Sequence, residues 1–97
     1  MKVKELLSDE SKWTRNAYAR NRYGESVLPS DPEATCFCLS GAIDKCYGSN
    51  PPLAWAVSCK IEGVLPRAWH GGIQTISNFN DNACFDQIKK VLEEADV

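Results

Sequence analysis

The chain has 97 residues, a formal net charge of −2 and 43% hydrophobic residues. A chain of this length fits one domain and excludes an enzyme built from two lobes around a cleft. No apolar stretch approaches the roughly 20 residues of a membrane-spanning helix, and the first seven residues lack the apolar core of a signal peptide. We therefore expect one domain over residues 1–97, located in the cytoplasm and without a membrane partner.

The net charge is the sum of two oppositely charged regions. Residues 1–24 hold six basic and three acidic side chains, a net charge of +3, whereas residues 25–97 hold five basic and ten acidic ones, a net charge of −5. Between residues 25 and 44 there are four carboxylates and no lysine or arginine. This asymmetry predicts one basic and one acidic surface with different partners.

The first 28 residues predict a helix followed by a turn. Val3, Leu6 and Leu7 have helical spacing within residues 3–12,. Residues 21–24 predict a turn, because Gly24 can adopt a positive φ without a Cβ clash. The residues on either side of this turn could pair as a short β-hairpin between the first two helices.

Residues 30–48 carry the strongest helix signals in the chain. Ser30 as N-cap with Glu33 three residues later forms a capping box, and Pro32 suits the first helical turn. We expect this helix to run through Tyr47 and to stop at Gly48. Its predicted core face consists of Cys36, Leu39, Ile43 and Cys46, widened by Cys38 and Ala42.

A third helix is predicted from Leu53 to about Glu62. Asn50 is the expected N-cap, two prolines follow it, and Gly63 is expected to end the helix,. Its residues are apolar on nearly every side, which predicts a central, buried helix.

Two further elements are expected after a connector over residues 64–72. Ile73, Ile76 and Phe79 recur every three residues, which fits a short helix or a turn. The last helix, from about Cys84 to Ala95, carries one hydrophobic stripe, made by Ile88, Val91, Leu92 and Ala95. The chain is therefore predicted to be mainly α, a single compact domain of about four helices, with an α+β fold as the alternative.

Five cysteines without a secretion signal indicate a reducing compartment,. We expect the thiols to be reduced and buried, because free cysteine behaves as a small hydrophobe. Zinc is the alternative, but no Cys-x-x-Cys occurs, and Cys36 and Cys38 would point about 200° apart on a helix. His70 is the single histidine. We therefore expect no metal and no cofactor.

Several sequence landmarks fall in a characteristic order. They are Trp13, the Gly24 turn, the segment Pro32-x-Ala34-x-x-x-Cys38-x-x-Gly41-Ala42, and Asn80-Asp81 before the closing helix. This order resembles a family of small uncharacterised bacterial and phage proteins over nearly the whole chain. The resemblance implies a shared fold and a phage or bacterial context, but no activity. The chain departs from the family in its extra cysteines and in Cys84, which stands where a threonine-type cap is common.

These landmarks also have a purely structural interpretation. Gly41 and Ala42 would let a second helix approach closely. Asn80 and Asp81 would bond backbone amides and fix the entry to the last helix.

A thiol enzyme is the one catalytic hypothesis that the residues offer. Cys38 or Cys36 would be the nucleophile, His70 the base, and Asn78 or Asn80 would orient the imidazole. The chain order matches that of papain-like enzymes. However, the cysteines are predicted to lie on the apolar side of a helix, and papain-like enzymes are larger. We therefore expect a protein that is not an enzyme.

One binding hypothesis uses the basic segment 12–23, in which arginines alternate with aromatic residues. This composition suits phosphate contact combined with base stacking. The candidate nucleic-acid-binding residues are Arg15, Tyr18, Arg20, Arg22 and Tyr23. The pI of about 5.3 argues against a dedicated nucleic-acid-binding domain,.

The other binding hypothesis uses the acidic remainder of the chain, and it is the one we favour. A compact acidic phage-type protein can occupy the basic groove of a host protein, for example a defence or CRISPR complex, and so compete with nucleic acid. The candidate partner-binding residues are Glu25, Asp31, Glu33, Asp44, Glu93 and Glu94, with Asp96 beside the last two.

Overall fold

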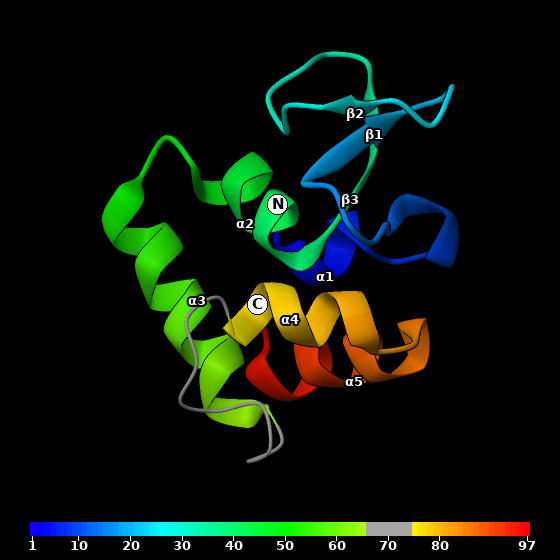
Figure 1. The fold of residues 1–97 in the computed structure, drawn as a ribbon. Coiled ribbons are helices and arrows are strands. Elements are labelled where there is room, and N and C mark those ends of the chain that lie inside the picture. Colours follow the sequence, from blue (N-terminus) through cyan, green and yellow to red (C-terminus); the bar gives the residue numbers. More distant parts are fainter. Residues whose placement is uncertain (66–74) are drawn as a thin grey trace.

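The computed structural model describes residues 1–65 and 75–97. The elements in chain order are α1 (Val3–Leu6), a 3-10 turn η1 (Glu10–Lys12), β1 (Ala19–Asn21), β2 (Ser26–Val27), β3 (Ala34–Phe37), α2 (Leu39–Tyr47), α3 (Pro51–Val64), α4 (Thr75–Asn82) and α5 (Phe85–Ala95). The three strands form an antiparallel sheet in the order β2-β1-β3. Figure 1 shows this small sheet at one end of the molecule, with α4 and α5 at the other. The prediction of a mainly α chain with a little β structure is confirmed.

The first predicted helix is shorter than its expected range of 3–12. It ends at Leu6, and a separate 3-10 turn begins after Asp9, whose carboxylate accepts a hydrogen bond of 3.1 Å from the Ser11 amide. Asp9 therefore starts a new turn instead of continuing the helix. Val3 and Leu7 are both buried in the core.

The predicted hairpin is confirmed. Ala19 pairs with Val27 and Arg20 with Ser26, and Gly24 has a φ of 79° in the intervening turn. Asn21 completes the turn, because its Oδ1 accepts hydrogen bonds from the amides of Tyr23 and Glu25 at 2.9 and 3.0 Å.

The second predicted helix starts eight residues too early, with its N-cap at Ser30 instead of Cys38, and this is the main error in the predicted fold. Residues 34–37 form β3, which pairs with β1 through Arg20 and Cys36, and α2 begins only at Leu39 after the N-cap Cys38. The Asp31 carboxylate accepts a bond of 2.8 Å from the Glu33 amide, so the expected capping signal closes a loop instead of a helix,. Cys36 and Cys38 therefore do not share a helix.

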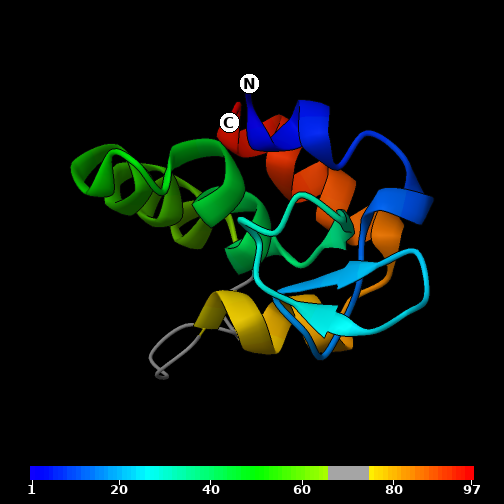
Figure 2. The same cartoon turned by 90° about the horizontal axis from the view of Figure 1, so that it is seen from above.

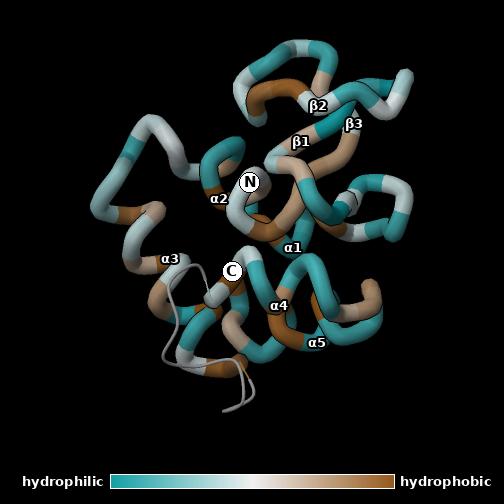
Figure 3. The backbone as a smooth tube through the Cα atoms, viewed as in Figure 1, coloured by the Kyte–Doolittle hydropathy of each residue, from teal (hydrophilic) through white to brown (hydrophobic). Residues whose placement is uncertain are grey.

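The centre of the helical part is α2, not α3 as predicted. Helix α2 contacts α1, α3, α4 and β3. Hydrophobic residues occur along much of α3 (Figure 3), yet its buried residues are Val57 and Ile61, and Trp55 is 72% exposed. The start of α3 agrees with the prediction, because Asn50 Oδ1 accepts a bond of 3.4 Å from the Leu53 amide. Its end does not, because the helix passes Gly63 and stops at Val64.

The last two helices agree with the prediction within the described residues. Ile76 and Phe79 lie on the buried side of α4, while Ile73 and most of the expected connector lie outside the described residues. In α5, Ile88 and Leu92 are fully buried. This helix begins after Cys84, whose amide donates a bond of 3.0 Å to Gln87 Oε1.

The two ends of the chain lie side by side, as Figure 2 shows. The Lys4 amide donates a hydrogen bond of 2.9 Å to the Val97 carbonyl. The Asp96 carboxylate forms ion pairs with Lys2 and Lys4. Contacts between α1 and α5 therefore close the helical part of the fold.

The cysteines are only partly buried, which corrects the prediction of buried thiols. All five are free; Cys38 is buried and Cys36 and Cys46 are half-buried. Cys59 and Cys84 are exposed, because one lies on the outward face of α3 and the other caps α5 from outside. In the described part of the chain, no helix combines the length and the apolar character needed to cross a membrane.

Candidate functional site

A buried asparagine joins three segments of the chain. Asn80 on α4 is fully buried, and its Oδ1 accepts hydrogen bonds from Trp13 Nε1 at 2.7 Å and from the Leu39 amide at 3.0 Å. Its Nδ2 donates to the Thr14 carbonyl and to Asp81 Oδ1, both at 3.1 Å. All four hydrogen bonds that the amide can make are therefore formed. Asn80 fixes α4 against the start of α2 and the segment before β1, and we call this arrangement the Asn80 hub.

Asp81 extends the hub toward the surface. Its Oδ1 also accepts a hydrogen bond of 3.0 Å from the Asn16 amide. Asn16 has a φ of 61°, in the left-handed region that asparagine tolerates better than most residues,. The predicted bonds from Asn80 and Asp81 to backbone amides are thus present. They hold α2 and the segment before β1, however, and not the entry to α5.

Gly41 lets the chain pass close to the start of α2. A Cβ atom on Gly41 would lie 1.8 Å from the Tyr18 carbonyl oxygen, which accepts a hydrogen bond of 3.2 Å from the Cys38 amide. The predicted close approach at Gly41 exists, but the neighbour is the backbone before β1 and not a second helix. Cys38 Sγ accepts a hydrogen bond of 3.2 Å from the Gly41 amide, so the thiol stands in for the usual oxygen of an N-cap,.

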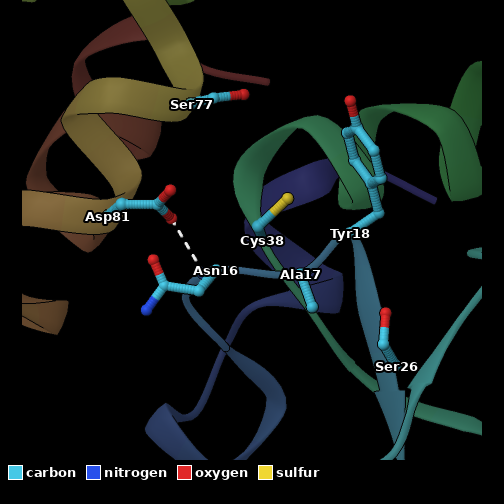
Figure 4. Close-up of a pocket in the computed structure, with 7 residues that line it drawn as sticks. All are labelled: Asn16, Ala17, Tyr18, Ser26, Cys38, Ser77 and Asp81. Atoms are coloured by element: carbon cyan, nitrogen blue, oxygen red, sulfur yellow. Dashed lines mark hydrogen bonds between the residues drawn. The ribbon is translucent and has the colours of Figure 1, made fainter.

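These contacts surround an open pocket of about 460 Å³. It is lined by Asn16, Ala17, Tyr18, Ser26, Cys38, Ser77 and Asp81. Figure 4 shows Ser77 and Asp81 on the α4 side of this pocket and Tyr18 and Ser26 across from them, with Cys38 between. We call it the Cys38–Asp81 pocket. Two of the landmark residues of the sequence, Cys38 and Asp81, thus line one cavity.

The Cys38 thiol is unsuited to nucleophilic chemistry. Burial raises its pKa; the amides of Gly41 and Ser40 act in the opposite direction, and the negative charge of Asp81 adds to the rise. A protonated thiol is a poor nucleophile at neutral pH.

The other members of the predicted thiol triad do not surround Cys38. Cys36 lies in β3, with its Sγ 3.8 Å from the Arg20 carbonyl oxygen. The Asn80 side chain makes all its hydrogen bonds within the hub, Asn78 is exposed on α4, and His70 lies outside the described residues. Among the described residues, no three histidine, cysteine or acidic side chains are placed to hold a metal ion.

Two arginines of the basic segment, the exposed Arg15 and the half-buried Arg20, donate hydrogen bonds to other residues of the protein. The Arg15 guanidinium donates to the Ala83 carbonyl and lies 5.0 Å from the centre of the Trp13 ring. Arg20 donates to Thr14 Oγ1 at 3.1 Å, and to the carbonyls of Gly24 and Arg15 at 2.9 and 3.3 Å. Both guanidinium groups therefore hold the segment before β1 in place.

The other three candidate nucleic-acid-binding residues, Tyr18, Arg22 and Tyr23, are exposed. Tyr18 is 58% exposed and lines the Cys38–Asp81 pocket, while Tyr23 is 68% exposed at the hairpin turn. The Arg22 guanidinium lies 4.8 Å from the centre of the Tyr23 ring. The five candidate nucleic-acid-binding residues are therefore divided among the segment before β1, β1 itself, the pocket and the turn.

The candidate acidic residues lie on different parts of the surface. Glu25 is in the hairpin turn, Asp31 and Glu33 are in the loop before β3, and Asp44 is on α2. Glu93 and Glu94 belong to α5, which Figure 1 shows at the opposite end of the molecule from the hairpin. The two acidic groups therefore face different surroundings.

Three lining residues of the pocket, Asn16, Ser26 and Ser77, carry no functional signal of their own in the sequence. Each is an ordinary polar residue in its own segment, and only the folded backbone brings them together. Cys38 and the Asn80-Asp81 pair, both among the sequence landmarks, were the indications of this region.

The comparison with protein families gives a clear result. A model described as a family of unknown function (DUF6197) matches residues 1–96. The chain belongs to this family. The matched range includes the whole Asn80 hub and every residue that lines the Cys38–Asp81 pocket, so both are part of the DUF6197 region. No curated protein and no solved structure matches the chain.

Proposed function

We propose that this DUF6197 chain is a small, non-enzymatic interaction protein of phage or prophage type that acts in the bacterial cytoplasm. It binds and inhibits a host protein that has a basic nucleic-acid groove, for example a defence or CRISPR complex, and competes there with nucleic acid. The observation that carries this proposal is a contrast between charges. Arg15 and Arg20 donate hydrogen bonds within the protein, whereas five of the six candidate carboxylates are exposed.

The carboxylates are available to a partner. Glu25, Glu33 and Asp44 are exposed, as are Glu93 and Glu94 on the other side. Among the described residues, the ion pairs join Asp96 to Lys2 and Lys4 and neutralise none of these five. Exposed like charges of this kind steer association with a basic surface and set its salt dependence.

The non-enzymatic part of the proposal is supported by the state of Cys38. Cys38 lines the pocket, but burial raises the pKa of its thiol, and its Sγ accepts a hydrogen bond from the Gly41 amide. The phage context is supported by the order of Trp13, Cys38, Gly41 and the Asn80-Asp81 pair, which resembles small bacterial and phage proteins.

A nucleic-acid-binding module is the second candidate. Arg22 and Tyr23 at the hairpin turn are exposed and stacked on each other, a pairing that suits a phosphate beside a base,. The engagement of Arg15 and Arg20 within the fold weighs against it.

The test is a competition experiment. Tagged protein is used to capture partners from a bacterial lysate, and each captured protein is then challenged with double-stranded DNA. We expect DNA to displace the partner and the double variant Glu33→Lys with Asp44→Lys to weaken binding by about tenfold or more, as for desolvated charge pairs. Glu62→Lys, an exposed charge reversal on α3, serves as the matched control.

The opposite results are equally clear. A partner that DNA does not displace, or that binds the double variant as tightly as the wild type, would contradict the proposal. A salt-sensitive gel shift with DNA that disappears in Arg22→Glu would favour the nucleic-acid-binding module instead.

A further inference from the structure

The Cys38–Asp81 pocket combines one carboxylate, one aromatic ring and several neutral polar groups. None of its seven lining residues is lysine, arginine or histidine. The carboxylate comes from Asp81 on α4, the ring from Tyr18 before β1, and hydroxyl groups from Ser26 and Ser77. The only charge that the lining residues contribute is therefore negative.

The two carboxylate oxygens of Asp81 differ in their hydrogen bonds. Its Oδ1 accepts the hydrogen bonds from Asn16 and Asn80, whereas its Oδ2 accepts none from any described residue. Asp81 is half-buried and lines the pocket. Figure 4 shows the carboxylate on the same helix as Ser77 and across the pocket from Tyr18. A partly desolvated carboxylate oxygen without a donor favours a charged N–H group.

Tyr18 supplies the second half of the recognition. Its side chain is 58% exposed and makes no hydrogen bond with the described residues. The ring is therefore held in place mainly by its backbone, which is fixed by the bond from the Cys38 amide to the Tyr18 carbonyl. The Tyr18 ring and the Asp81 carboxylate line the pocket from opposite sides, with Cys38 between them (Figure 4). An aromatic ring and a carboxylate that line one cavity can bind the two parts of a long organic cation, through a cation–π contact and a charge-assisted hydrogen bond.

We infer that the Cys38–Asp81 pocket binds the cationic end of an arginine or lysine side chain presented by the partner protein. This inference rests on the proposed function for the source of the cation, and it adds a defined anchoring point to the acidic surface. The cavity of about 460 Å³ lies in the lower half of the usual range for small-ligand sites, roughly 300–1,000 Å³,. That size suits one long side chain.

Other ligand classes fit this pocket less well. A phosphate or carboxylate would meet the charge of Asp81 without a cation to balance it. An apolar group would desolvate the hydroxyls and the free carboxylate oxygen. A divalent metal would need more ligands than the described residues bring together here,.

The test is a titration followed by NMR on uniformly ¹⁵N-labelled full chain. The probe is N-acetyl-arginine-methylamide, and the comparison compound is the citrulline analogue, which has the same shape and no charge. We expect saturable shifts at the amides of Asn16, Tyr18 and Ser77 with the arginine compound, and at least about fivefold weaker binding of the citrulline compound.

Two variants separate recognition from folding. Asp81→Asn keeps an oxygen for the Asn16 and Asn80 donors and removes the charge, so we expect about tenfold weaker binding with an unchanged spectrum elsewhere. Tyr18→Leu removes the ring at an exposed position and should weaken binding by about fivefold. Asp86→Asn on α5 removes the same charge from a residue that does not line the pocket and should leave the affinity unchanged.

Several results would overturn the inference. One is an Asp81→Asn affinity equal to that of the wild type; another is equal binding of the citrulline compound. Tighter binding of spermidine than of the arginine compound would assign the pocket to a free polyamine and refute a partner side chain. Arginine binding in a protein that captures no DNA-displaced partner would refute the proposed function alone. A DNA-displaced partner without arginine binding would refute the pocket alone.

Discussion

The Asn80 hub and helix α3 hold to the rest of the fold by opposite means. The hub is a buried polar group whose hydrogen bonds reach Trp13, Thr14 and Leu39 in two distant segments. Helix α3 is 14 residues long and rich in hydrophobic residues, yet its buried residues are Val57 and Ile61. A few directional hydrogen bonds therefore position the segments that meet at the hub, whereas ordinary apolar burial positions α3.

The largest expected effect comes from breaking the hub. Asn80→Ala leaves the Trp13 indole N–H and the Leu39 amide without their acceptor, and unsatisfied buried donors of this kind should lower the free energy of unfolding by about 3–5 kcal/mol in total,. Urea denaturation followed by circular dichroism measures the change. Asn82→Ala on the exposed side of α4 is the control, and a loss below about 1 kcal/mol in Asn80→Ala would show that the hub is not a main support.

A second prediction compares one glycine from each region. Gly41→Ala forces a methyl group into the Tyr18 carbonyl and should cost about 2–3 kcal/mol, because backbone must shift,. Gly63→Ala on α3 meets no atom within 4 Å and should stabilise the helix by up to about 1 kcal/mol,. The same denaturation experiment measures both variants. Similar effects at the two positions would contradict the contrast between hub and α3.

The smallest expected effect concerns the exposed contact between the chain ends. Hydrogen bonds from Lys4 and then Lys2 lower the pKa of Asp96 below its ordinary value of 3.8. Because the folded-state pKa is the lower one, this contact stabilises the fold above pH 3.8, and the contribution is lost as pH falls through the folded-state pKa,. Asp96→Asn should therefore flatten the decline of Tm between about pH 5 and pH 2, and Asn also tolerates the left-handed backbone at this position,.

The control for this pH dependence is Asp86→Asn on the same helix. That variant should keep the acid-induced decline of Tm seen in the wild type. An Asp96→Asn profile that follows the wild type at every pH would show that the end-to-end ion pairs contribute nothing measurable, as many exposed pairs do.

Local signals predicted the elements that depend on neighbouring residues alone. The Gly24 turn, the Asn50 cap of α3 and the stripe of α5 all follow from residues within one or two turns. The predicted start of α2 is wrong because it depends on residues that are distant in the sequence. Residues 34–37 form a strand because β1, fifteen residues earlier, provides hydrogen-bond partners that a capping box at Ser30 does not reveal,.

The same distinction applies to the candidate site. The prediction that Asn80 and Asp81 accept hydrogen bonds from backbone amides is confirmed. The donor residues lie more than 40 residues away, however, and no local sequence pattern identifies them. The prediction that α3 is buried on all sides is wrong. The hydrophobic content of a helix indicates how much surface it could bury, but not how many neighbouring elements surround it,. The pocket assembles from four segments and therefore has no signature in any one of them.

The meeting of the chain ends has a consequence for the order in which the protein is made. Residues 3–7 are synthesised before the residues of α5, but α1 packs against α5, and the Lys4 amide bonds to the Val97 carbonyl. The contacts between α1 and α5 therefore form only after residue 97 has left the ribosome. Until then the surface of α1 that α5 covers stays exposed, and a chaperone can bind the nascent chain there.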